Sequence, residues 1–507
     1  CLIKVIVPLH GINESLYGFA QRFCVVIAHD YLDSTSSNSE LSTLKKRYPD
    51  VTFAKTSRSP EPFDVIAAEL NDERSAQFSE KWIVGYGHSS VAEHAVLHLA
   101  LENVSRLAIE TIEANRLASY TEKSTRYQEW DPKAYVTPPE ILGSPCEGEY
   151  KELMGTLFGI YAEALQALRP WGEANTPRRE NESEKAWANR ARVKSVDVAR
   201  FLLPSAAMAN VGLTINARAL EYAIKKMLSS ELEEVRQIGA EVKAVAQQEL
   251  PTLVKYADPI AFLPQLRTKA RVFADRIDTI YGAPWCDLKD ADESGEDRIL
   301  AAVLYRFGDD SYQVCLDQVL NMPNEEKQAL VDVMFAEMTD FDIPIRELEY
   351  ADLSFSLIMD QGAYFEFKRH RMMTQTVQDL TARLGYAIPK AITEAGFEMR
   401  YREAMRAAAV VYEKLASWNP QVASYVVPNA FNRRVLCRAN LRELFHFIKL
   451  RCARNAHFSI QRVGRGMLEA VRPHFPLLSQ KIQVKGDISA QALTEEYFTE
   501  TAAKPIL

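Results

Sequence analysis

The sequence predicts a tandem duplication, in which two helix-rich domains of about 200 residues each follow one another along the chain. Three observations predict it. The chain has 507 residues, too many for one hydrophobic core, so two or more domains are expected. A signature near residue 120 recurs near residue 370. After each copy, a proline precedes an asparagine by the same number of positions, at Pro204 and Asn216 and at Pro428 and Asn440.

The first copy is expected over residues 51–280, after an N-terminal extension formed by residues 1–50. Apolar residues recur at helical spacing over residues 77–121 with no interrupting proline, which predicts a mostly helical stretch. Residues 208–232 are apolar at first and then amphipathic, which again indicates helix. The highly charged residues 169–194 indicate a surface insertion.

A second boundary is expected at residues 281–298. Gly282 and Pro284 break regular structure, and the acidic run that follows is typical of a solvated linker. Helical periodicity resumes at residues 299–307. The second copy is therefore expected over residues 299–507.

Composition narrows the class of protein. With 47% hydrophobic and 25% charged residues the chain is typical of globular proteins, and 60 basic against 68 acidic residues give a net charge of −8. This charge argues against bulk binding of nucleic acid or of an anionic membrane, although a local basic pocket stays possible. No apolar run reaches membrane-spanning length. The seven cysteines are scattered without a Cys-x-x-Cys pair, which indicates reduced thiols in a cytoplasmic protein.

The first candidate site is the turn-like stretch Ser124, Thr125 and Arg126. A hydroxyl group, backbone N–H groups and a guanidinium together can bind a phosphate. The planar guanidinium donates two parallel hydrogen bonds, and the backbone N–H groups donate without a charge that must lose its water. The alternative is a solvated turn with a surface arginine.

The second candidate is the triplet Arg369, His370 and Arg371. Three adjacent donors cannot share one face of a helix, so a helix end or a turn is expected. Repulsion between the two arginines favours an anion there, such as phosphate, pyrophosphate or a reduced flavin. The alternative is a basic surface beside Lys368.

A third group follows Gly87. Ser90 and Glu93 have the spacing of a helix capping box, whereas His88 has no such structural explanation. His94 and His98 would share one helical face, but no third ligand is evident and such a pair is more often packing, so no metal is predicted.

A fourth group repeats in both copies as Asn-x-Arg, at Asn216 and Arg218 and at Asn440 and Arg442. In a helix beginning near Asn440, Arg451 would lie on the same face as Asn440, about three turns away.

Together these motifs resemble the flavin-dependent thymidylate synthases. The signature of that family is Arg-His-Arg followed at a fixed distance by Ser-x-Arg, with an upstream Gly-His loop and a downstream Asn-x-Arg that precedes a further arginine. The likeness covers residues 51–255 and, in a second copy, residues 300–480. It implies a helix-rich α+β fold with a mixed sheet.

The resemblance also implies an activity, which is the reductive methylation of dUMP to dTMP. FAD is the implied cofactor, and NADPH and methylenetetrahydrofolate are the implied co-substrates. No cysteine nucleophile is implied. The family assembles as homotetramers with sites at subunit interfaces. A chain with two copies is therefore expected to form a homodimer that acts as a pseudo-tetramer, without nucleic acid or membrane as a partner.

Roles are implied residue by residue. The implied catalytic residues are Arg451, which stabilises the pyrimidine ring as an anion, His88 near folate and flavin, and Ser124. The nucleotide is implied to contact Glu366, Arg369, Arg451, Arg200, Glu122, Lys123, Ser124, Thr125 and Arg126. FAD is implied to contact Ser90, Glu122, Arg369, His370, Arg371, Asn440, Arg442 and His446.

Each copy departs from the family pattern differently. The first has Ala114 and Asn115 in place of Arg-His, and Met227 in place of the activating arginine. The second has lost the Gly-His loop, has Thr381 in place of the signature serine, and has Ser424 where the first has Arg200.

These losses are complementary. One working site is expected from His88 and residues 122–126 of the first copy with residues 369–371 and Arg451 of the second. The other site is expected to be dead. In this scheme the nucleotide-binding arginine at the position of Arg200 would have to come from the second copy, but Arg200 stands in the first.

Two alternatives stay open. Glu366, which replaces the usual glutamine, and the altered loops motivate hydroxymethylation or methylation of another pyrimidine nucleotide. The lost signature residues motivate a non-catalytic nucleotide- or flavin-binding paralogue.

Overall fold

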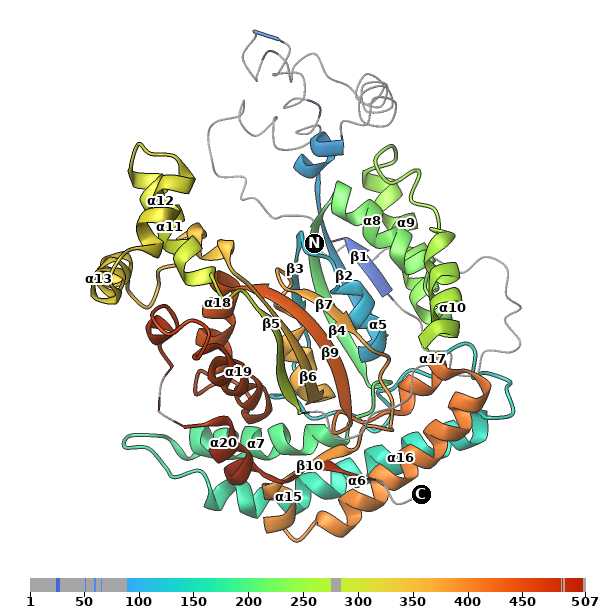
Figure 1. Cartoon of the computed structure of the whole chain (residues 1–507). Helices are drawn as coiled ribbons and strands as arrows, with labels where there is room; N and C mark the ends of the chain where they lie inside the picture. The colour runs from blue at the N-terminus through green and yellow to red at the C-terminus, as the bar shows by residue number, and fades with distance from the viewer. Residues whose placement is uncertain are drawn as a thin grey trace. The chain divides into compact units, whose positions relative to one another are not determined.

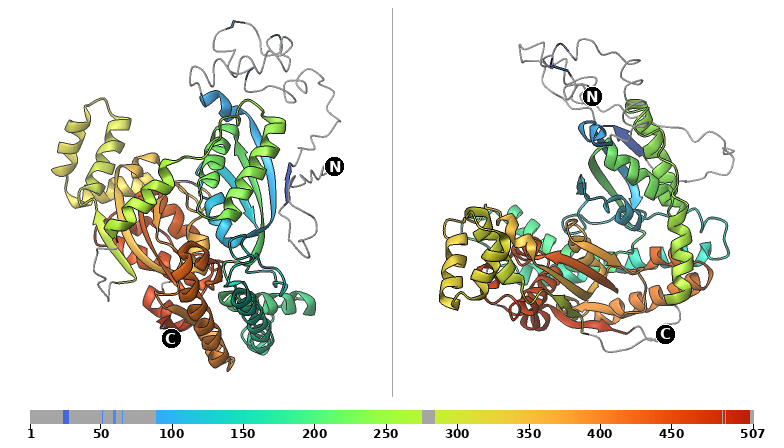
Figure 2. Two further views of the ribbon diagram at one scale, coloured as in Figure 1. Left: turned by 90° about the vertical axis from the view of Figure 1, so that its right-hand side faces the viewer. Right: turned by 45° about the horizontal axis from the view of Figure 1, so that its top comes forward.

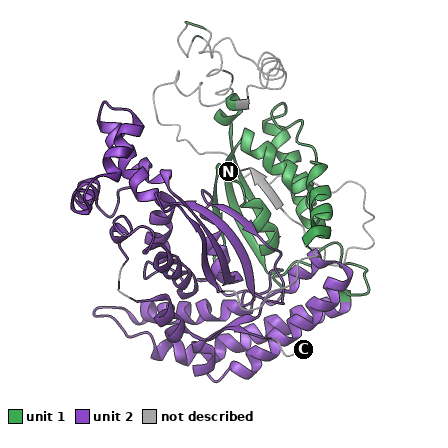
Figure 3. Ribbon diagram, viewed as in Figure 1, with its two compact units in different colours: residues 1–124, 133–147, 206–278 green, residues 125–132, 148–205, 279–507 purple. Residues whose placement is uncertain are grey.

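The computed structural model divides into two compact units (Figure 3). The first unit comprises residues 1–124, 133–147 and 206–278, and the second comprises residues 125–132, 148–205 and 279–507. Within them the structure describes residues 24–27, 51, 59–60, 65, 89–274, 284–484, 486 and 488–504. The last boundary between the units, after residue 278, lies close to the predicted boundary at residues 281–298, but residues 125–132 and 148–205 of the first copy belong to the second unit.

The first unit contains a four-stranded antiparallel sheet of order β1-β2-β4-β3. Its strands are β1 (Cys24–Ile27), β2 (Val96–Ser105), β3 (Ala118–Glu122) and β4 (Met208–Asn216). Its described helices are η3 (Ser89–His94), α5 (Arg106–Ile112), α8 (Ala217–Leu228), α9 (Glu233–Glu249) and α10 (Phe262–Ala274). Apolar side chains of α5, α8 and α9 pack with those of β2 and β4 in one core.

The second unit repeats this sheet as β5-β6-β9-β7, again antiparallel. Its strands are β5 (Cys286–Ala291), β6 (Asp352–Asp360), β7 (Thr374–Val377) and β9 (Asn432–Asn440). A two-stranded sheet joins β8 (Tyr386–Pro389) to β10 (Phe498–Ala503). Because both four-stranded sheets have the same strand order, the duplication predicted from the sequence is visible in the fold.

The helices of the second unit surround its sheets (Figures 1 and 2). From the first copy come α6 (Glu147–Ala174), α7 (Glu184–Ala199) and η4 (Arg200–Leu202). From the second copy come α11 (Gly295–Phe307), α12 (Tyr312–Leu320), α13 (Asn324–Phe335), η5 (Arg346–Tyr350), α14 (Gln361–Phe367), α15 (Lys390–Glu394), α16 (Glu398–Trp418), α17 (Pro420–Ala423), η6 (Ser424–Val426), α18 (Leu441–Arg451), α19 (Phe458–Val471), η7 (Ser479–Lys481) and α20 (Ala490–Tyr497). None of the described helices has the length and apolarity needed to cross a membrane.

Three expectations about strands need correction. The described sheets are antiparallel and not mixed. Strand β5 occupies the acidic segment that was predicted to be a linker, and β1 lies in the predicted N-terminal extension. Both strands occupy the same edge position of their sheets, so each begins its copy earlier than the helical periodicity indicated.

Two predicted helices are also wrong in part, since residues 77–121 include β2 and most of β3, and residues 208–232 begin with β4. Leu97, Leu99 and Leu101 are buried and alternate with less buried residues, which is the period of a strand. Apolar residues occur on both faces of this strand, so some of them also happen to follow the spacing of a helix. His94 and His98 therefore share no helical face, and His98 Nδ1 lies 2.8 Å from the Thr214 hydroxyl on the neighbouring strand.

The two copies meet inside the second unit through the motif that marks the repeat. The Ser205 N–H donates to the Val427 carbonyl at 3.0 Å, and the Asn429 N–H donates to the Leu203 carbonyl at 3.0 Å. Since Ser205 corresponds to Asn429 and Leu203 to Val427, the two hydrogen bonds are related by a local pseudo-two-fold axis. The motif that reveals the duplication thus also joins its two halves.

The longest helix of each copy contributes to the same contact region. Glu149 and Glu163 of α6 pair with Lys414 and Arg400 of α16, respectively. The order of these pairs shows that the two helices run antiparallel, and Figure 1 shows them side by side. This packing brings η4 of the first copy next to elements of the second.

One buried hydrogen bond is mirrored between the copies. Ser105, the N-cap of α5, donates from its hydroxyl to Glu234 of α9 at 2.7 Å. In the second copy the N-cap of α14 is Asp360, and Ser459 of α19 donates its hydroxyl to it. In the first copy the N-cap provides the hydroxyl group and the later helix the carboxylate, whereas in the second copy the N-cap provides the carboxylate. The hydrogen bond is thus kept although both residue types differ.

Candidate functional site

The Arg-His-Arg triplet lies in the turn that follows α14, as expected from three adjacent donors. Arg369 is exposed, His370 is buried and Arg371 is half-buried. The three side chains thus have different environments, and the histidine is the one held inside the protein.

His370 links two charged residues. Its Nε2 accepts a hydrogen bond from Arg451 Nε at 2.8 Å, and its Nδ1 lies 3.3 Å from a carboxylate oxygen of Glu443. Burial, and then repulsion from Arg451 and His446, lower the pKa of His370 to about 2. The imidazole is therefore neutral, with its proton on Nδ1 toward Glu443.

Arg451, at the end of α18, also donates from Nη1 to Glu366 Oε2 at 3.1 Å. The other carboxylate oxygen of Glu366 lies 3.7 Å from Arg200 Nη2. Glu366 thus stands between an arginine of each copy. Burial, with repulsion from Arg369 and Arg126, lowers the pKa of Arg451, yet an arginine stays charged at any ordinary pH.

Arg200 is buried at the start of η4. Its Nη2 donates to the Gly362 carbonyl at 3.4 Å and its Nε lies 3.7 Å from Asp197 Oδ1. A Cβ atom at Gly362 would lie 3.4 Å from Arg200 Nη2 and 3.0 Å from Asp360 Oδ1, so glycine keeps room for the guanidinium. The sequence scheme did not call for Arg200, but the structure brings it to the residues of the second copy.

Arg126 shares Asp197 with Arg200. Its Nε and Nη2 donate to the two oxygens of Asp197 at 2.9 Å each, and its Nη1 donates to the Asn455 carbonyl at 3.0 Å. Burial acts to raise the pKa of Asp197, but His457, Arg200 and Arg126 hold it below its ordinary value. Asp197 is therefore an anion that fixes two arginines.

These five residues, Arg126, Asp197, Arg200, Glu366 and Arg451, form what we call the arginine cluster, all within the second unit. Three guanidinium groups face two carboxylates, which leaves one positive charge unbalanced. Such a buried excess of charge favours an anionic ligand that can accept several hydrogen bonds.

Other predicted site residues make local contacts or stand at the surface of their own unit. Glu122 is buried and pairs with Arg106 at 2.8 Å within the first unit. The backbone N–H of Lys123 donates to the Asn210 carbonyl, Ser124 is half-buried and Thr125 is buried. Ser90 is exposed on η3, and His88 lies outside the described residues.

The Asn-x-Arg motif has the same structural role in both copies. Asn216 and Asn440 are the N-caps of α8 and α18, and each side chain accepts a backbone N–H. Arg218 pairs with Glu93, and Arg442 donates to Glu349 at 2.7 Å. Capping and an ion pair thus account for the motif, whereas His446 is exposed, with its ring centroid 5.6 Å from that of His370.

The counterparts of three cluster residues make other contacts within their own units. Arg383 is exposed and donates to both oxygens of Glu413, at 2.8 and 2.7 Å. Ser424, at the position of Arg200, donates to the Leu380 carbonyl at 2.8 Å. Met227, at the position of Arg451, is buried in the core of the first unit.

Four residues of the site were missed by the sequence argument, namely Asp197, Glu443, Asn455 and His457. His457 is buried and its Nε2 lies 3.2 Å from the Asp197 carbonyl oxygen. Asp197 lies one helical turn before Arg200, and Glu443 lies three residues after Asn440. This closeness to motif residues is the only signal in the sequence that pointed toward them.

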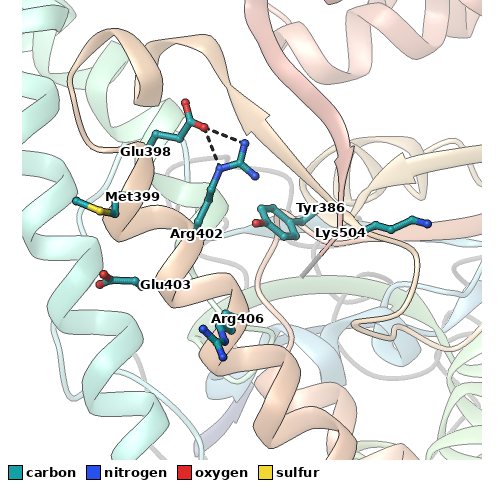
Figure 4. A pocket seen from close by; sticks show the side chains of 7 residues that line it. All are labelled: Tyr386, Glu398, Met399, Arg402, Glu403, Arg406 and Lys504. Carbon is teal, nitrogen blue, oxygen red and sulfur yellow. Dashed lines mark hydrogen bonds and ion pairs between the residues drawn. The ribbon is translucent and has the colours of Figure 1, made fainter. Parts of the chain in front are cut away.

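A surface pocket of about 520 Å³ also lies in the second unit, lined by residues of β8 and α16 and by Lys504 (Figure 4). Arg402 donates to Glu398 at 2.8 Å, and the ends of Lys504 and Arg406 point apart in the view. The pocket shares no lining residue with the arginine cluster.

A model of the family described as thymidylate synthase complementing protein matches residues 44–252 and 299–477. The chain belongs to this family. The two matched segments confirm the duplication and the family predicted from the motifs, and with them an enzyme class. Strands β1 and β5 and the elements after residue 477 lie outside the segments that match the thymidylate synthase complementing protein family.

Individual proteins are also similar to this chain. A UPF0159 protein from Chlamydia muridarum is 30% identical over 441 residues, which cover 82% of each chain. A flavin-dependent thymidylate synthase from Clostridium tetani is 28% identical over 209 residues, covering 41% of this chain and 80% of that protein. A crystal structure of thymidylate synthase X from Helicobacter pylori with FAD and dUMP aligns with a TM-score of 0.30 at 15% identity, covering 40% of this chain and 99% of that one.

Proposed function

We propose that the chain catalyses the FAD-dependent reductive methylation of dUMP to dTMP, with methylenetetrahydrofolate as carbon donor and NADPH as reductant. The observation that carries the proposal is the arginine cluster, which joins Arg126 and Arg200 of the first copy to Arg451 of the second around one unbalanced positive charge. Family membership and relatives named flavin-dependent thymidylate synthase support it.

In this proposal the nucleotide phosphate binds at Arg200 and Arg126. Arg126 is fixed by its hydrogen bonds to Asp197 and to the Asn455 carbonyl and contributes its positive charge to phosphate binding, while Arg200 Nε, which makes no hydrogen bond within the described residues, donates to the phosphate. A phosphate shared by two guanidinium groups receives charge-assisted hydrogen bonds and neutralises the excess charge. Asp197 keeps the two arginines together before the ligand arrives.

Arg451 is assigned to the pyrimidine ring. Its Nε and Nη1 are fixed by His370 and Glu366, so its guanidinium has a defined orientation before the nucleotide binds. A cation fixed in this way stabilises negative charge that develops on the ring without reorganising during the reaction. The neutral state of His370 matters here, because an imidazolium could not accept from Arg451.

FAD fits the side chains around His370. Arg369 and His446 are exposed and Arg371 is half-buried, so cationic and aromatic groups line this surface for an anionic flavin. Asn440 and Arg442 are already used by the helix cap and by Glu349, so we assign the contacts with FAD chiefly to the triplet and His446. The chemistry that bound FAD supplies in this proposal is a two-electron reduction.

The proposed assembly is a homodimer, since two chains supply four family-like copies. Light scattering at micromolar concentration tests it, and a monomer would contradict it.

The activity is tested first by the absorbance of the purified chain near flavin wavelengths, with FAD and with or without dUMP. Flavin binding, and tritium release from C5-labelled dUMP in the presence of NADPH and methylenetetrahydrofolate, are expected. A protein that shows no flavin absorbance after addition of FAD would contradict the proposal.

A second candidate function is nucleotide binding without thymidylate synthesis. The observation that favours it is that Asp197 and Glu366 already offset two of the three positive charges of the cluster. It predicts that dUMP binds without tritium release. Mass spectrometry of products from dUMP, UMP and dCMP separates this outcome from methylation or hydroxymethylation of another pyrimidine nucleotide.

A further inference from the structure

Two buried polar atoms of the arginine cluster make no hydrogen bond within the part of the chain that the structure describes. They are Arg200 Nε and Glu366 Oε1. The two residues are 2% and 5% exposed, so solvent does not compensate them. Buried polar atoms without a partner are rare in folded proteins. A donor and an acceptor left open in one cluster point to a ligand that provides the matching groups.

One further atom of each side chain is hydrogen-bonded, which constrains where the open atoms lie. Glu366 Oε2 accepts from Arg451 at 3.1 Å, and Arg200 Nη2 donates to the Gly362 carbonyl at 3.4 Å. The 3.7 Å between Arg200 Nη2 and Glu366 Oε1 is too long for a hydrogen bond. A ligand that satisfies both open atoms must therefore place a hydrogen-bond acceptor near Arg200 Nε and a hydrogen-bond donor near Glu366 Oε1.

The order of contacts assigns these two groups to parts of the ligand. Arg126 and Arg200 share Asp197 at one end, Arg451 stands at the other end, and Glu366 lies between Arg200 and Arg451. A nucleoside monophosphate with its phosphate at the first end and its base at the second places its sugar in the middle. The group of a sugar that donates a hydrogen bond is a hydroxyl.

We propose that Glu366 is the residue that determines specificity for the sugar of the nucleotide, with Oε1 accepting a hydrogen bond from a sugar hydroxyl group. This inference rests on the proposed function, since it takes a pyrimidine nucleoside monophosphate as the ligand. An ionised carboxylate only accepts hydrogen bonds, so a ligand without a donor at this place leaves Oε1 buried and unpaired. The site thereby selects against nucleotides that lack the hydroxyl.

The test compares the affinities of dUMP and of 2′,3′-dideoxyuridine 5′-monophosphate, measured by equilibrium dialysis on the full chain. Loss of the hydroxyl is expected to weaken binding to the wild-type chain about tenfold to a hundredfold, because the lost hydrogen bond is charge-assisted. Two variants then ask whether Glu366 is the cause. Glu366→Gln keeps the volume and an acceptor for Arg451, and Glu366→Ala removes both oxygens.

In Glu366→Ala the two nucleotides are expected to bind with equal affinity, and in Glu366→Gln the difference is expected to fall below about tenfold, as for a neutral hydrogen bond. Glu413→Gln serves as the control, because Glu413 is a partly exposed carboxylate that also pairs with an arginine, and it is expected to keep the wild-type ratio. Thermal unfolding of each variant checks that it is folded.

Two results would overturn the inference. Equal binding of the two nucleotides to the wild-type chain would show that no hydroxyl is recognised. If the ratio of the two affinities were unchanged in folded Glu366→Gln and Glu366→Ala variants, a residue other than Glu366 would recognise the sugar hydroxyl. In both cases dUMP still binds and the proposed function survives, whereas a wild-type chain that binds neither nucleotide would remove both proposals.

Discussion

Arg126 donates two parallel hydrogen bonds, from Nε and Nη2, to the two carboxylate oxygens of Asp197 at 2.9 Å each. This is the geometry in which arginine binds a carboxylate or a phosphate with both arms. The same arginine reaches the Asn455 carbonyl at 3.0 Å, so one side chain of the first copy is tied to the loop that follows Arg451 in the second. Arg126 therefore contributes both to a site and to the contact between copies.

Replacing Arg126 by alanine is expected to abolish tritium release from C5-labelled dUMP, with a loss of at least about a hundredfold, since a fixed charge of the site is removed. Arg383→Ala is the matched control. Arg383 is the counterpart in the second copy, is exposed and pairs with Glu413, and exposed ion pairs contribute little. Its activity is expected to stay within about twofold of wild type. Equal losses in both variants would contradict the composite site.

The mirrored acid–hydroxyl pair makes a prediction about stability. Ser105→Asp places a second carboxylate against buried Glu234 and is expected to destabilise the chain by about 3 kcal/mol, as an uncompensated buried charge does. Adding Glu234→Ser recreates in the first copy the arrangement of Asp360 and Ser459. The double variant is expected to be at least about 1 kcal/mol more stable than the sum of the single effects. Urea denaturation measures it, and simple additivity would argue against equivalence of the two pairs.

The repeat was predictable because Pro204 and Pro428 and the asparagines that follow them keep both residue type and spacing. The strands at the sheet edges were not. The acidic β5 has no fully buried residue and pairs on only one side, as an edge strand does, so its composition resembles that of a loop. Its pairing with β6 is a long-range property that no local pattern carries.

The site was predictable only in part, for a similar reason. Arg126, His370 and Arg451 belong to recognisable motifs, and the structure links them by contacts through Asp197, Arg200 and Glu366, while their joint role in a composite site stays a prediction. Asp197 carries no motif, and its role depends on the fold that places α7 beside the second copy. Asn440 and Arg442 are part of a recognisable motif, but the sequence did not predict that they form a helix cap and an ion pair, and their contact with FAD stays a prediction.

Asn429 and Ser205 occupy equivalent places in the contact between copies, which allows positioning to be separated from stability. Asn429 donates from Nδ2 to the Arg200 carbonyl at 2.9 Å, whereas the Ser205 hydroxyl donates to the Val427 carbonyl at 3.1 Å. Replacing either by alanine is expected to cost about 0.5–1.5 kcal/mol of stability, because a buried carbonyl loses one of its two donors and keeps the backbone N–H of Leu203 or of Ser205. Only Asn429→Ala is expected to weaken dUMP binding, since only Asn429 holds the backbone of Arg200. Urea denaturation and equilibrium dialysis measure the two effects, and weaker dUMP binding in Ser205→Ala would contradict this assignment.

The neutral, buried state of His370 predicts how stability depends on pH. Burial lowers its pKa from 6.5 to about 2 in the folded chain. Between these values the unfolded chain binds a proton that the folded chain does not, so stability is fully present above pH 6.5 and falls as the pH decreases below it. Burial also lowers the pKa of His457 well below 6.5, so the same sign holds for that residue.

Between pH 7 and pH 5.5, each of these histidines is expected to remove about 1 kcal/mol from the free energy of unfolding. His370→Gln keeps an acceptor for Arg451 and a donor for Glu443 but cannot titrate, so it is expected to lose roughly half of this dependence. Urea denaturation of both chains at pH 5.5 and pH 7 measures the difference. If His370→Gln retained the full dependence on pH, His370 would not be the neutral acceptor that fixes Arg451.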